Sequence, residues 1–416
     1  MTVLIAMVNV LLSVLGYVVC RGLIKEYIPI FISRKMYGND QCKKTDDPIP
    51  EPMGVICAAA YLIVMFVFIP FPFIEWIGAA SAFPYAKFLS FLSALISICT
   101  AILLGFADDM LDLKWRHKLA FPTLSSLPIL MVYYVSGGST TVIIPSAVRT
   151  LLSSVVPPSV FPSIPSAVDI NIFYYVFMCM VVVFCTNAIN ILAGINGLES
   201  GQAIILAMSV IVYNLVQIGR LDESWDNMLS LYFLIPFLAC TSALFQFNNY
   251  PARVFVGDTF CYWAGMTLAV VSILGHFSKT MILFLIPQVF NFLYSIPQLF
   301  KLVPCPRHRL PKFDGTTNTV GMSVAQFKEG DLKLLGRISL RLLSTCGLLY
   351  TKKFEKDGER WQEINNLTIL NLVLKFAGPL HERTLTNILL SIQVICSVFA
   401  FFVRFYLASF LYDVVN

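Results

Sequence analysis

Ten long stretches of apolar residues, each free of charged side chains, divide the chain. Each contains at least 17 residues, about the length that an α-helix needs to cross the hydrocarbon core of a bilayer. Because unpaired backbone groups are unfavourable in lipid, such stretches are expected to be helical. The predicted spans cover residues 2–20, 53–74, 88–107, 119–136, 170–186, 200–219, 227–247, 259–275, 280–300 and 384–403. The pattern therefore predicts an all-α polytopic membrane protein with about ten transmembrane helices.

The composition supports lipid as the solvent for most of the chain. Of the 416 residues, 57% are hydrophobic and 13% are charged, whereas a soluble domain carries roughly 25% charged residues. That composition makes a water-soluble core implausible. The formal net charge of +5 by itself says little about partners. We expect the lipid bilayer as a partner and no nucleic acid.

The basic residues are concentrated on one side of the predicted bundle. With ten spans, 24 of the 29 lysines and arginines fall in connections on the side opposite to both termini. Basic residues remain on the cytoplasmic side of a membrane. We therefore expect both termini to face a lumen and the basic connections to face the cytosol. The sequon Asn366-Leu367-Thr368 would then be cytosolic, and we predict that it is unmodified.

The connection between the ninth and tenth spans has the pattern of a small folded domain. Short apolar runs alternate with charged ones, and residues 355–360 have the composition of a hairpin turn. Residues 364–374 are predicted to form an amphipathic helix on the membrane interface. We therefore divide the chain into spans one to nine (1–300), a cytosolic mixed α/β insertion (301–383), and the tenth span with a luminal C-terminus (384–416).

Two adjacent carboxylates, Asp108 and Asp109, follow the third span. Keeping two such groups side by side at the end of an apolar helix is unfavourable unless a cation neutralises them. A single aspartate would indicate an ordinary solvated helix end. This pair is followed by basic or histidine positions, namely Lys114, Arg116, His117 and Lys118. The segment therefore favours a site for Mg²⁺ and phosphate.

A segment rich in asparagine and glycine follows the fifth span. Its polar and small residues are Asn187, Asn190, Gly194, Asn196 and Gly197. Asparagine supplies neutral oxygen ligands and amide donors, and glycine allows backbone to approach a ligand closely. Hydrogen bonding between helices in the bilayer would explain one asparagine but explains three poorly.

Asp258 lies at the start of the eighth span. Alone it would be interpreted as a helix N-cap with Thr259 in the first turn. Together with the aspartate pair and the asparagine oxygens on the same predicted face, it completes a set of ligands suited to a hard cation.

A proline-bounded loop follows the ninth span and presents Arg307-His308-Arg309 between Pro304 and Pro311. Prolines stiffen such a loop, and the guanidinium fork of arginine suits phosphate oxygens. The alternative is a surface anchor that binds anionic lipid.

With these motifs together, the chain resembles the polyprenyl-phosphate N-acetylhexosamine-1-phosphate transferase family over almost its whole length. The most specific segments are 105–118, 184–199, 253–260, 275–288 and 304–309. The resemblance implies a membrane enzyme of the endoplasmic reticulum with a cytosol-facing site. It would transfer GlcNAc-1-phosphate from UDP-GlcNAc to dolichyl phosphate, release UMP and require Mg²⁺. The family also suggests a homodimer.

The resemblance assigns roles to individual residues. The residues that match the reaction centre are Asn190 and Asp258 as magnesium ligands, Asp108 and Asp109 as the catalytic acidic pair, and Lys118 near the lipid phosphate. The residues that match the donor site are Asn187 beside the phosphates, Glu51, Gly194, Asn196 and Phe255 around the uridine, Arg307 at the pyrophosphate, and His308 and Arg309 in the loop that recognises the N-acetyl sugar.

Two other functions fit parts of the pattern. Asp108, Asp109 and Asp112 have the DDxxD spacing by which prenyltransferases bind a prenyl diphosphate, but no second aspartate-rich motif lies on the same predicted side. A transporter would place its polar motifs near mid-membrane and contain an internal repeat. Here the motifs gather at one face and no repeat is visible, so a phosphotransferase remains the favoured prediction.

Overall fold

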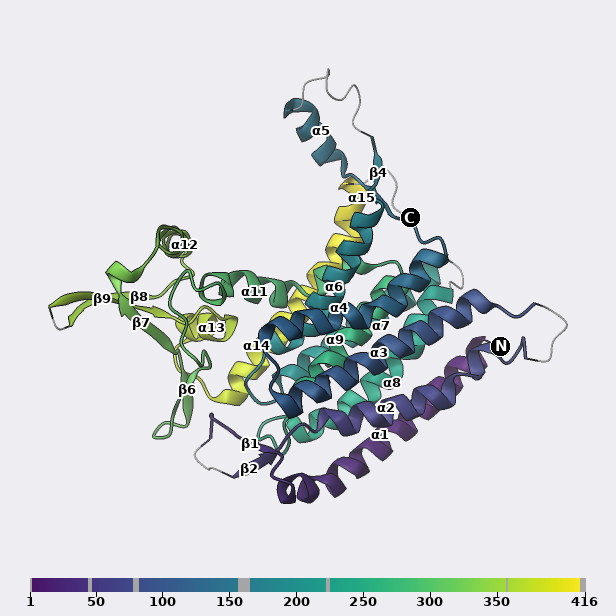
Figure 1. Cartoon of the computed structure of the whole chain (residues 1–416), viewed down its shortest axis with the longest axis horizontal. Coiled ribbons are helices and arrows are strands. Elements are labelled where there is room, and N and C mark those ends of the chain that lie inside the picture. Colours follow the sequence, from purple (N-terminus) through teal and green to yellow (C-terminus); the bar gives the residue numbers. More distant parts are fainter. Residues whose placement is uncertain are drawn as a thin grey trace.

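The computed structural model describes residues 2–43, 47–77, 82–155, 165–221, 225–356 and 358–411 (Figure 1). Within these residues, nine helical segments are long and apolar enough to cross a membrane. The helices that form them are α1 (Thr2–Ser33), α2 (Gly54–Phe68, followed by the short helix η1, Phe71–Phe73), α3 (Tyr85–Leu111), α4 (Trp115–Val135), α6 (Ile172–Ile191), α7 (Leu198–Leu221), α8 (Trp225–Asn248), α9 (Gly257–Leu274) and α14 (Glu382–Phe402). The prediction of a polytopic helical membrane protein is confirmed.

The predicted ninth span is not one continuous helix. Its residues form α10 (Ser278–Phe284) and α11 (Ile286–Leu299), which meet at an angle of 73°. Pro287 explains the break, because it lacks the N–H that would bond to the carbonyl four residues earlier. The sequence pattern detected the apolar length of this segment but missed the interruption. Counting the bent pair as one span gives up to ten among the described residues.

α9 is the most buried span of the described bundle, and α3 and α6 pack against it. Glycine makes both contacts close. A Cβ at Gly105 of α3 would lie 2.8 Å from the Cα of Thr259, and one at Gly265 of α9 would lie 2.2 Å from the carbonyl oxygen of Cys185 on α6. These contacts bring the last turns of α3 and α6 beside the first turn of α9.

The insertion between α11 and α14 is a small mixed α/β unit, as predicted. It contains β5 (Lys312–Asp314), β6 (Thr319–Gly321), β7 (Val324–Lys328), the short helix η2 (Glu329–Asp331), α12 (Leu334–Thr345), β8 (Thr351–Lys356), β9 (Glu359–Asn365) and α13 (Ile369–Ala377). β7, β9 and β8 form an antiparallel sheet in that order, and β5 pairs with β6. The predicted hairpin is the β8–β9 connection.

The predicted interfacial helix at 364–374 is wrong. Residues up to Asn365 belong to β9, and α13 buries Ile369, Leu370 and Leu374 in a cluster with residues of the bundle and Leu372 inside the insertion. The amphipathic pattern of this segment reflects packing against the rest of the protein. Asn366 is also buried, with an exposed fraction of 1%, and its side-chain nitrogen donates to Ser323 Oγ at 2.8 Å.

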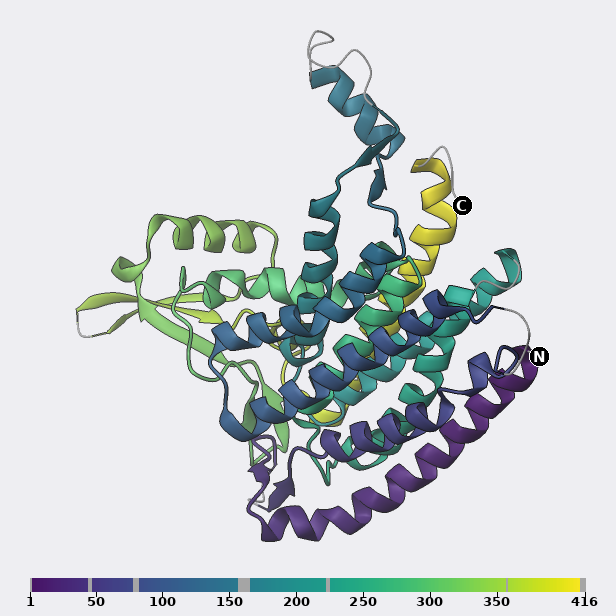
Figure 2. The ribbon, with the colours of Figure 1, turned by 45° about the vertical axis from the view of Figure 1, so that its right-hand side comes forward.

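The remaining elements lie at the two ends of the bundle (Figure 1, Figure 2). The hairpin of β1 (Tyr37–Asn39) and β2 (Pro48–Pro50) lies at the same end as the insertion. The opposite end carries the start of α1, the last described turn, and the segment of β3, α5 and β4. The elements not yet bounded are β3 (Thr141–Ile143), α5 (Ser146–Val155), β4 (Ala167–Asp169), η3 (Val403–Leu407) and α15 (Ala408–Leu411).

Candidate active site

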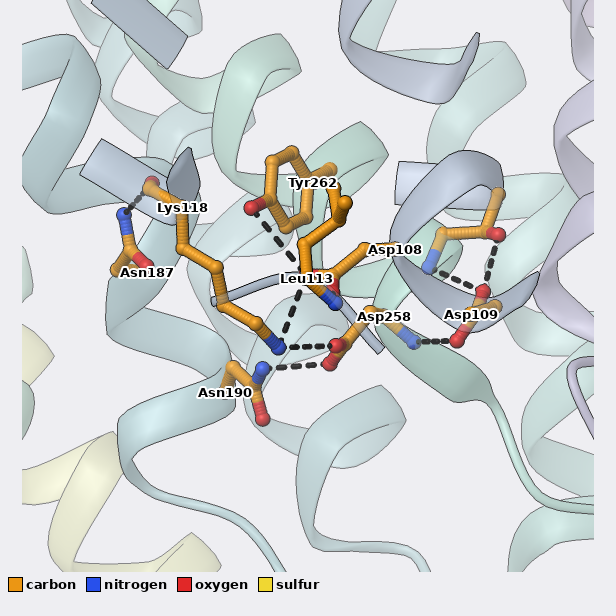
Figure 3. A network of polar contacts seen from close by, with 9 residues as sticks. Asp108, Asp109, Leu113, Lys118, Asn187, Asn190, Asp258 and Tyr262 are labelled. Carbon is orange, nitrogen blue, oxygen red and sulfur yellow. Dashed lines mark hydrogen bonds and ion pairs between the residues drawn. The ribbon is translucent and has the colours of Figure 1, made fainter. Parts of the chain in front are cut away.

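Polar side chains gather where four helix ends meet, at the end of the bundle nearest the insertion. α3 and α6 end there, and α4 and α9 begin there (Figure 3). α3 ends at Leu111 and is capped by Asp112, which has a φ of 45°, and the N–H of Leu113 donates to Asp108 Oδ1 at 3.1 Å. This tight turn leads directly into α4, so Lys118 returns to a position near Asp108.

Lys118 lies between two carboxylates that come from different helices. Its Nζ is 2.9 Å from Asp108 Oδ2 and 2.9 Å from Asp258 Oδ2. The Tyr262 hydroxyl, one turn along α9, donates to Asp108 Oδ2 at 3.4 Å. The side chain of Asp108 is only 1% exposed and that of Lys118 is 21% exposed. Two negative charges and one positive charge in such a setting attract a further cation.

Asn190 reaches the same cluster from the last turn of α6. Its Nδ2 donates to Asp258 Oδ1 at 2.5 Å. Rotation of the amide would place Oδ1 where Nδ2 lies, which would change the side chain from a donor to a metal ligand. Asn187, one turn earlier, donates to the carbonyl of Val183 at 2.8 Å and lies 3.5 Å from the carbonyl oxygen of Lys118.

The two adjacent aspartates have different environments. Asp109 turns away from Lys118 and accepts hydrogen bonds at the N-terminus of α9, from the N–H of Asp258 at 2.6 Å and the N–H of Thr259 at 2.8 Å. It also accepts a hydrogen bond from the Thr259 hydroxyl. A carboxylate is favoured at a helix N-terminus by the free N–H groups and the helix dipole. Asp109 therefore holds the first turn of α9, and with it Asp258, in position.

A cavity of about 630 Å³ lies beside this cluster and brings together most of the predicted site residues. Those in its lining are Glu51, Asp108, Asp109, Asn190, Gly194, Asn196, Phe255 and Asp258. Backbone pairing joins the two loops on one side of the cavity, because the N–H of Phe255 donates to the carbonyl of Pro50 at 2.8 Å. Gly194, with a φ of +106°, provides an accessible stretch of backbone on another side.

Glu51 is a titratable group in the lining of this cavity, and it lies outside the spans. Burial, reinforced by the charges of Asp109 and Asp258, raises the pKa of Glu51 to about 7. A carboxyl group with that pKa exists in both protonation states near neutral pH, so it can donate or accept a hydrogen bond.

A second polar network, missed by sequence reasoning, supports Asn196. Asp40 Oδ2 accepts from Asn196 Nδ2 at 2.9 Å and pairs with Lys43 Nζ at 3.2 Å. The backbone N–H of Asn196 donates to Glu382 Oε1 at 2.7 Å. Asn196 Oδ1 accepts from the N–H of Ala252 at 2.7 Å. The only sequence signal was the spacing of Asp40 and Lys43, which gives no indication of partners more than 150 residues away.

Comparison with known proteins finds relatives that match most of the chain. The profile of "Glycosyl transferase family 4" matches residues 91–276. A relative from Saccharomyces cerevisiae is 41% identical over 93% of this chain and 88% of its own length. One from Schizosaccharomyces pombe is 39% identical over 97% of this chain and 93% of its own. Both relatives are named UDP-N-acetylglucosamine–dolichyl-phosphate N-acetylglucosaminephosphotransferase.

The chain belongs to this N-acetylglucosaminephosphotransferase family. A more distant bacterial relative, a phospho-N-acetylmuramoyl-pentapeptide-transferase from Brachyspira hyodysenteriae, is 24% identical over 51% of the chain. The stretch matched by the family profile includes Asp108, Lys118, Asn190 and Asp258 but neither Glu51 nor the loop at 304–311. The profile match thus contains the cluster of helix ends together with most of the bundle from α3 to α9.

The arginine loop lies apart from that cluster in the phosphotransferase structure. Arg307 and His308 are exposed, and of residues 304–311 only Leu310 lines the cavity, where it packs on Gly194. The loop is held by its backbone, since the carbonyl of Arg309 accepts from Asn371 Nδ2 at 2.8 Å. The structure therefore brings together the helix-end residues and the residues around the cavity, but not the Arg307–Arg309 side chains.

The oxygen ligands in the cluster of helix ends fit a hard divalent cation. Carboxylate oxygens from Asp108 and Asp258 and an amide oxygen from Asn190 are the ligands that Mg²⁺ prefers. A second group with three ligand atoms within 4.8 Å of one another, Asp40, Cys42 and Glu382, contains sulfur. Burial and the charges of Glu382 and Asp40 raise the pKa of Cys42, so its thiol stays protonated. That group therefore suits Mg²⁺ less well.

Proposed function

We propose that this protein transfers GlcNAc-1-phosphate from UDP-GlcNAc to dolichyl phosphate, giving GlcNAc-pyrophosphoryl-dolichol and UMP, the first step of lipid-linked oligosaccharide synthesis. The observation that carries the proposal is the Lys118 cluster at the end of the bundle, beside a cavity of about 630 Å³. A water-soluble nucleotide sugar and a bilayer-bound phosphate can meet at such a position. The names of the relatives support the same reaction.

Asp258 and Asn190 would hold the divalent cation, with Asp108 nearby, and we assign the cation as Mg²⁺. When bound, Mg²⁺ would supply a Lewis acid that neutralises charge on the pyrophosphate oxygens. Lys118 and Asn190 already bond different oxygens of Asp258, which keeps the carboxylate in a fixed position. Asp109 contributes by anchoring the first turn of α9.

The reaction needs charge neutralisation more than it needs a strong base. The acceptor phosphate is already an anion, so its oxygen can attack the β-phosphorus of UDP-GlcNAc without prior loss of a proton. A new P–O bond forms there as the bond to the bridging oxygen breaks, and UMP leaves with that oxygen. Lys118, at the start of α4, lies at the depth of a lipid headgroup and would relieve the repulsion between the two anions.

The donor would occupy the cavity with its uridine between Glu51, Phe255 and the backbone at Gly194. Phe255 offers an aromatic face to the base, and Glu51 offers a hydrogen-bonding group. Asn196 would act by holding this wall of the cavity in place, because its side chain bonds Asp40 and Ala252 and its N–H bonds Glu382. Asn187 would lie beside the phosphates.

The arginine loop would complete the site around the sugar end of the donor. Arg307 is assigned to the pyrophosphate, and His308 and Arg309 to the N-acetyl sugar. Leu310 already lies in the cavity wall, so only the neighbouring side chains must turn to reach a bound donor. Binding of the donor would therefore be accompanied by reorganisation of this loop.

We further assign the protein to the endoplasmic reticulum membrane, with the site facing the cytosol, both termini in the lumen, and a homodimer as the assembly. The concentration of basic residues in the connections at the site's end supports this orientation.

Assay of the purified full-length protein with UDP-GlcNAc, dolichyl phosphate and Mg²⁺ tests the function. We expect a lipid-linked pyrophosphate product and equimolar UMP, both lost on addition of EDTA and restored by Mg²⁺. A parallel assay with a prenyl diphosphate in place of both substrates would detect prenyl transfer, which releases inorganic pyrophosphate from that compound. A folded protein that forms no product would overturn the proposal.

A further inference from the structure

α12 has two apolar faces, and only one of them is used inside the protein. Gly336 and Leu340 are buried and belong to the face that packs on the insertion. The opposite face carries four large apolar side chains with high exposed fractions, namely Leu334 (73%), Leu335 (61%), Ile338 (52%) and Leu342 (64%). Because successive residues are rotated by 100°, these four side chains point to the same side of the helix and cover roughly a quarter of its circumference. A soluble surface rarely presents such a stripe.

The attachment of α12 places this stripe near the level at which the chain leaves the bundle. A Cβ at Gly336 would lie 2.2 Å from the carbonyl oxygen of Leu302, three residues after α11 ends. Val303 and Leu340 belong to the same buried cluster. α12 is therefore packed on the segment that directly follows the broken span.

The direction of α12 differs from that of the spans. In Figure 1, α12 is viewed nearly along its axis, whereas α1 and α3 run across the picture. In Figure 2, α12 lies lengthwise above α11, and the β8–β9 hairpin extends away from the bundle. α12 thus lies across the direction of the spans, beside the place where the chain leaves the bundle after α11. This is the orientation of a helix that lies in the membrane interface.

The charges around the stripe are positive. The sequence from Leu332 to Tyr350 contains Lys333, Arg337 and Arg341 and no acidic residue. The two arginines also line a cavity of about 860 Å³ between α12 and the sheet, whose wall contains five basic and three acidic side chains. Basic residues that flank an apolar stripe fit the anionic headgroups of a bilayer.

We propose that α12 lies in the headgroup region of the leaflet on the active-site side, with Leu334, Leu335, Ile338 and Leu342 inserted at the acyl boundary and its basic residues on anionic lipid. α12 thereby holds the insertion against the membrane, in addition to the two helices, α11 and α14, that connect it to the bundle. This orients the arginine loop over the bilayer-bound acceptor. The inference goes beyond the proposed reaction and concerns how the insertion is held.

Site-directed labelling of the full-length protein in lipid vesicles tests this directly. The exposed cysteines are first replaced by Cys305→Ser and Cys346→Ser, and one new cysteine is introduced as Ile338→Cys or, as the matched control, Lys352→Cys on the exposed sheet. With a bulky water-soluble maleimide, we expect labelling at 338 to be at least about tenfold slower than at 352. Headgroup-proximal spin-labelled lipids should quench a fluorophore at 338 and not at 352. Equal labelling at the two positions would overturn the proposal.

The lipid chemistry is tested by changing the vesicles. Phosphatidylcholine vesicles with and without about 30% phosphatidylserine should differ in quenching at position 338, and Arg337→Gln with Arg341→Gln should remove the difference. Cross-linking between two Ile338→Cys protomers, with protection unchanged in detergent, would show that a second copy covers α12 and would overturn the proposal. None of these measurements depends on turnover, so failure of the proposed reaction would leave them interpretable.

Discussion

The helix-end cluster and the arginine loop, both expected at one site, are organised very differently. In the cluster, Lys118, Asp108, Asp258 and Asn190 are in direct contact and come from four helices that pack closely on one another. In the loop, Arg307 and His308 are exposed and only Leu310 reaches the cavity.

This difference indicates a division between fixed and adaptable parts of the site. Charges that must stabilise a transition state are most effective when the protein holds them in place before substrate arrives. Side chains that only bind the substrate can become ordered when it arrives, although ordering them reduces the affinity. Changes in the cluster should therefore affect turnover, and changes in the loop should affect the apparent affinity for the donor.

The largest effect is expected at Asp258. Asp258→Ala removes a charged partner of Lys118 and Asn190 and the proposed metal ligand, so turnover should fall below detection. A radiometric product assay at saturating UDP-GlcNAc and Mg²⁺ measures it. Asp226→Ala is the matched control, because Asp226 also lies in the first turn of a span, α8, but beside His276, which follows the far end of α9. Near-normal turnover of Asp258→Ala would remove Asp258 from the metal site.

The next largest effect on turnover is expected for Lys118→Ala. Loss of one preorganised electrostatic group costs about 10²–10³-fold in kcat, and here it also leaves Asp108 and Asp258 facing each other without compensation. Lys118→Arg retains the charge and should recover part of the activity. If instead KM for the donor rose while kcat stayed constant, Lys118 would belong with the binding residues.

Arg307→Ala should raise KM for UDP-GlcNAc and leave kcat much less affected. Hydrogen bonds to charged groups contribute about 1.5–3 kcal/mol, which corresponds to roughly 10–100-fold in affinity. Lys312→Ala removes an exposed positive charge a few residues away and serves as the control. Steady-state kinetics separate the two parameters, and a fall confined to kcat would contradict the division between cluster and loop.

Asp109→Asn should reduce stability as well as activity, because an amide oxygen accepts fewer of the bonds at the start of α9. Loss of a helix cap costs about 0.5–2 kcal/mol. A thermal melt of the purified protein should show the decrease, and Asp112→Asn, on the neighbouring turn, should not. An unchanged melting temperature would mean that Asp109 does not anchor α9.

The smallest effect concerns pH. The pKa of Glu51 is about 7 in the folded protein and about 4.5 in the unfolded chain, so the folded state binds this proton more tightly. The resulting contribution to the free energy of unfolding is fully present below pH 4.5. It is lost as the pH rises through 7. In EDTA, the wild-type melting temperature should fall from pH 6 to pH 8 by more than that of Glu51→Gln. Parallel profiles for the two proteins would show that Glu51 does not titrate in this range.

The sequence alone determined the membrane fold, because the apolar length that a bilayer demands is a local property of the chain. It also predicted the helix-end residues as ligands for cation and phosphate, since paired carboxylates and repeated asparagines are unusual at the ends of apolar spans. Tertiary structure decided what no local pattern contains. It bent the ninth span by 73° at Pro287, whereas the spans that contain Pro128 and Pro236 continue, so the presence of a proline did not by itself decide where a span breaks.

Packing also separated residues that are neighbours in sequence. Asp108 and Asp109 look alike as a pair, yet one faces Lys118 and the other binds the start of α9, because successive helical positions point in different directions. The same holds for the two amphipathic segments of the insertion. The pattern at 364–374 became an interior helix, while α12 kept an exposed apolar face. An amphipathic pattern indicates that the apolar face of a helix is covered. Only the surrounding fold determines whether protein covers it, as for α13, or lipid, as we propose for α12.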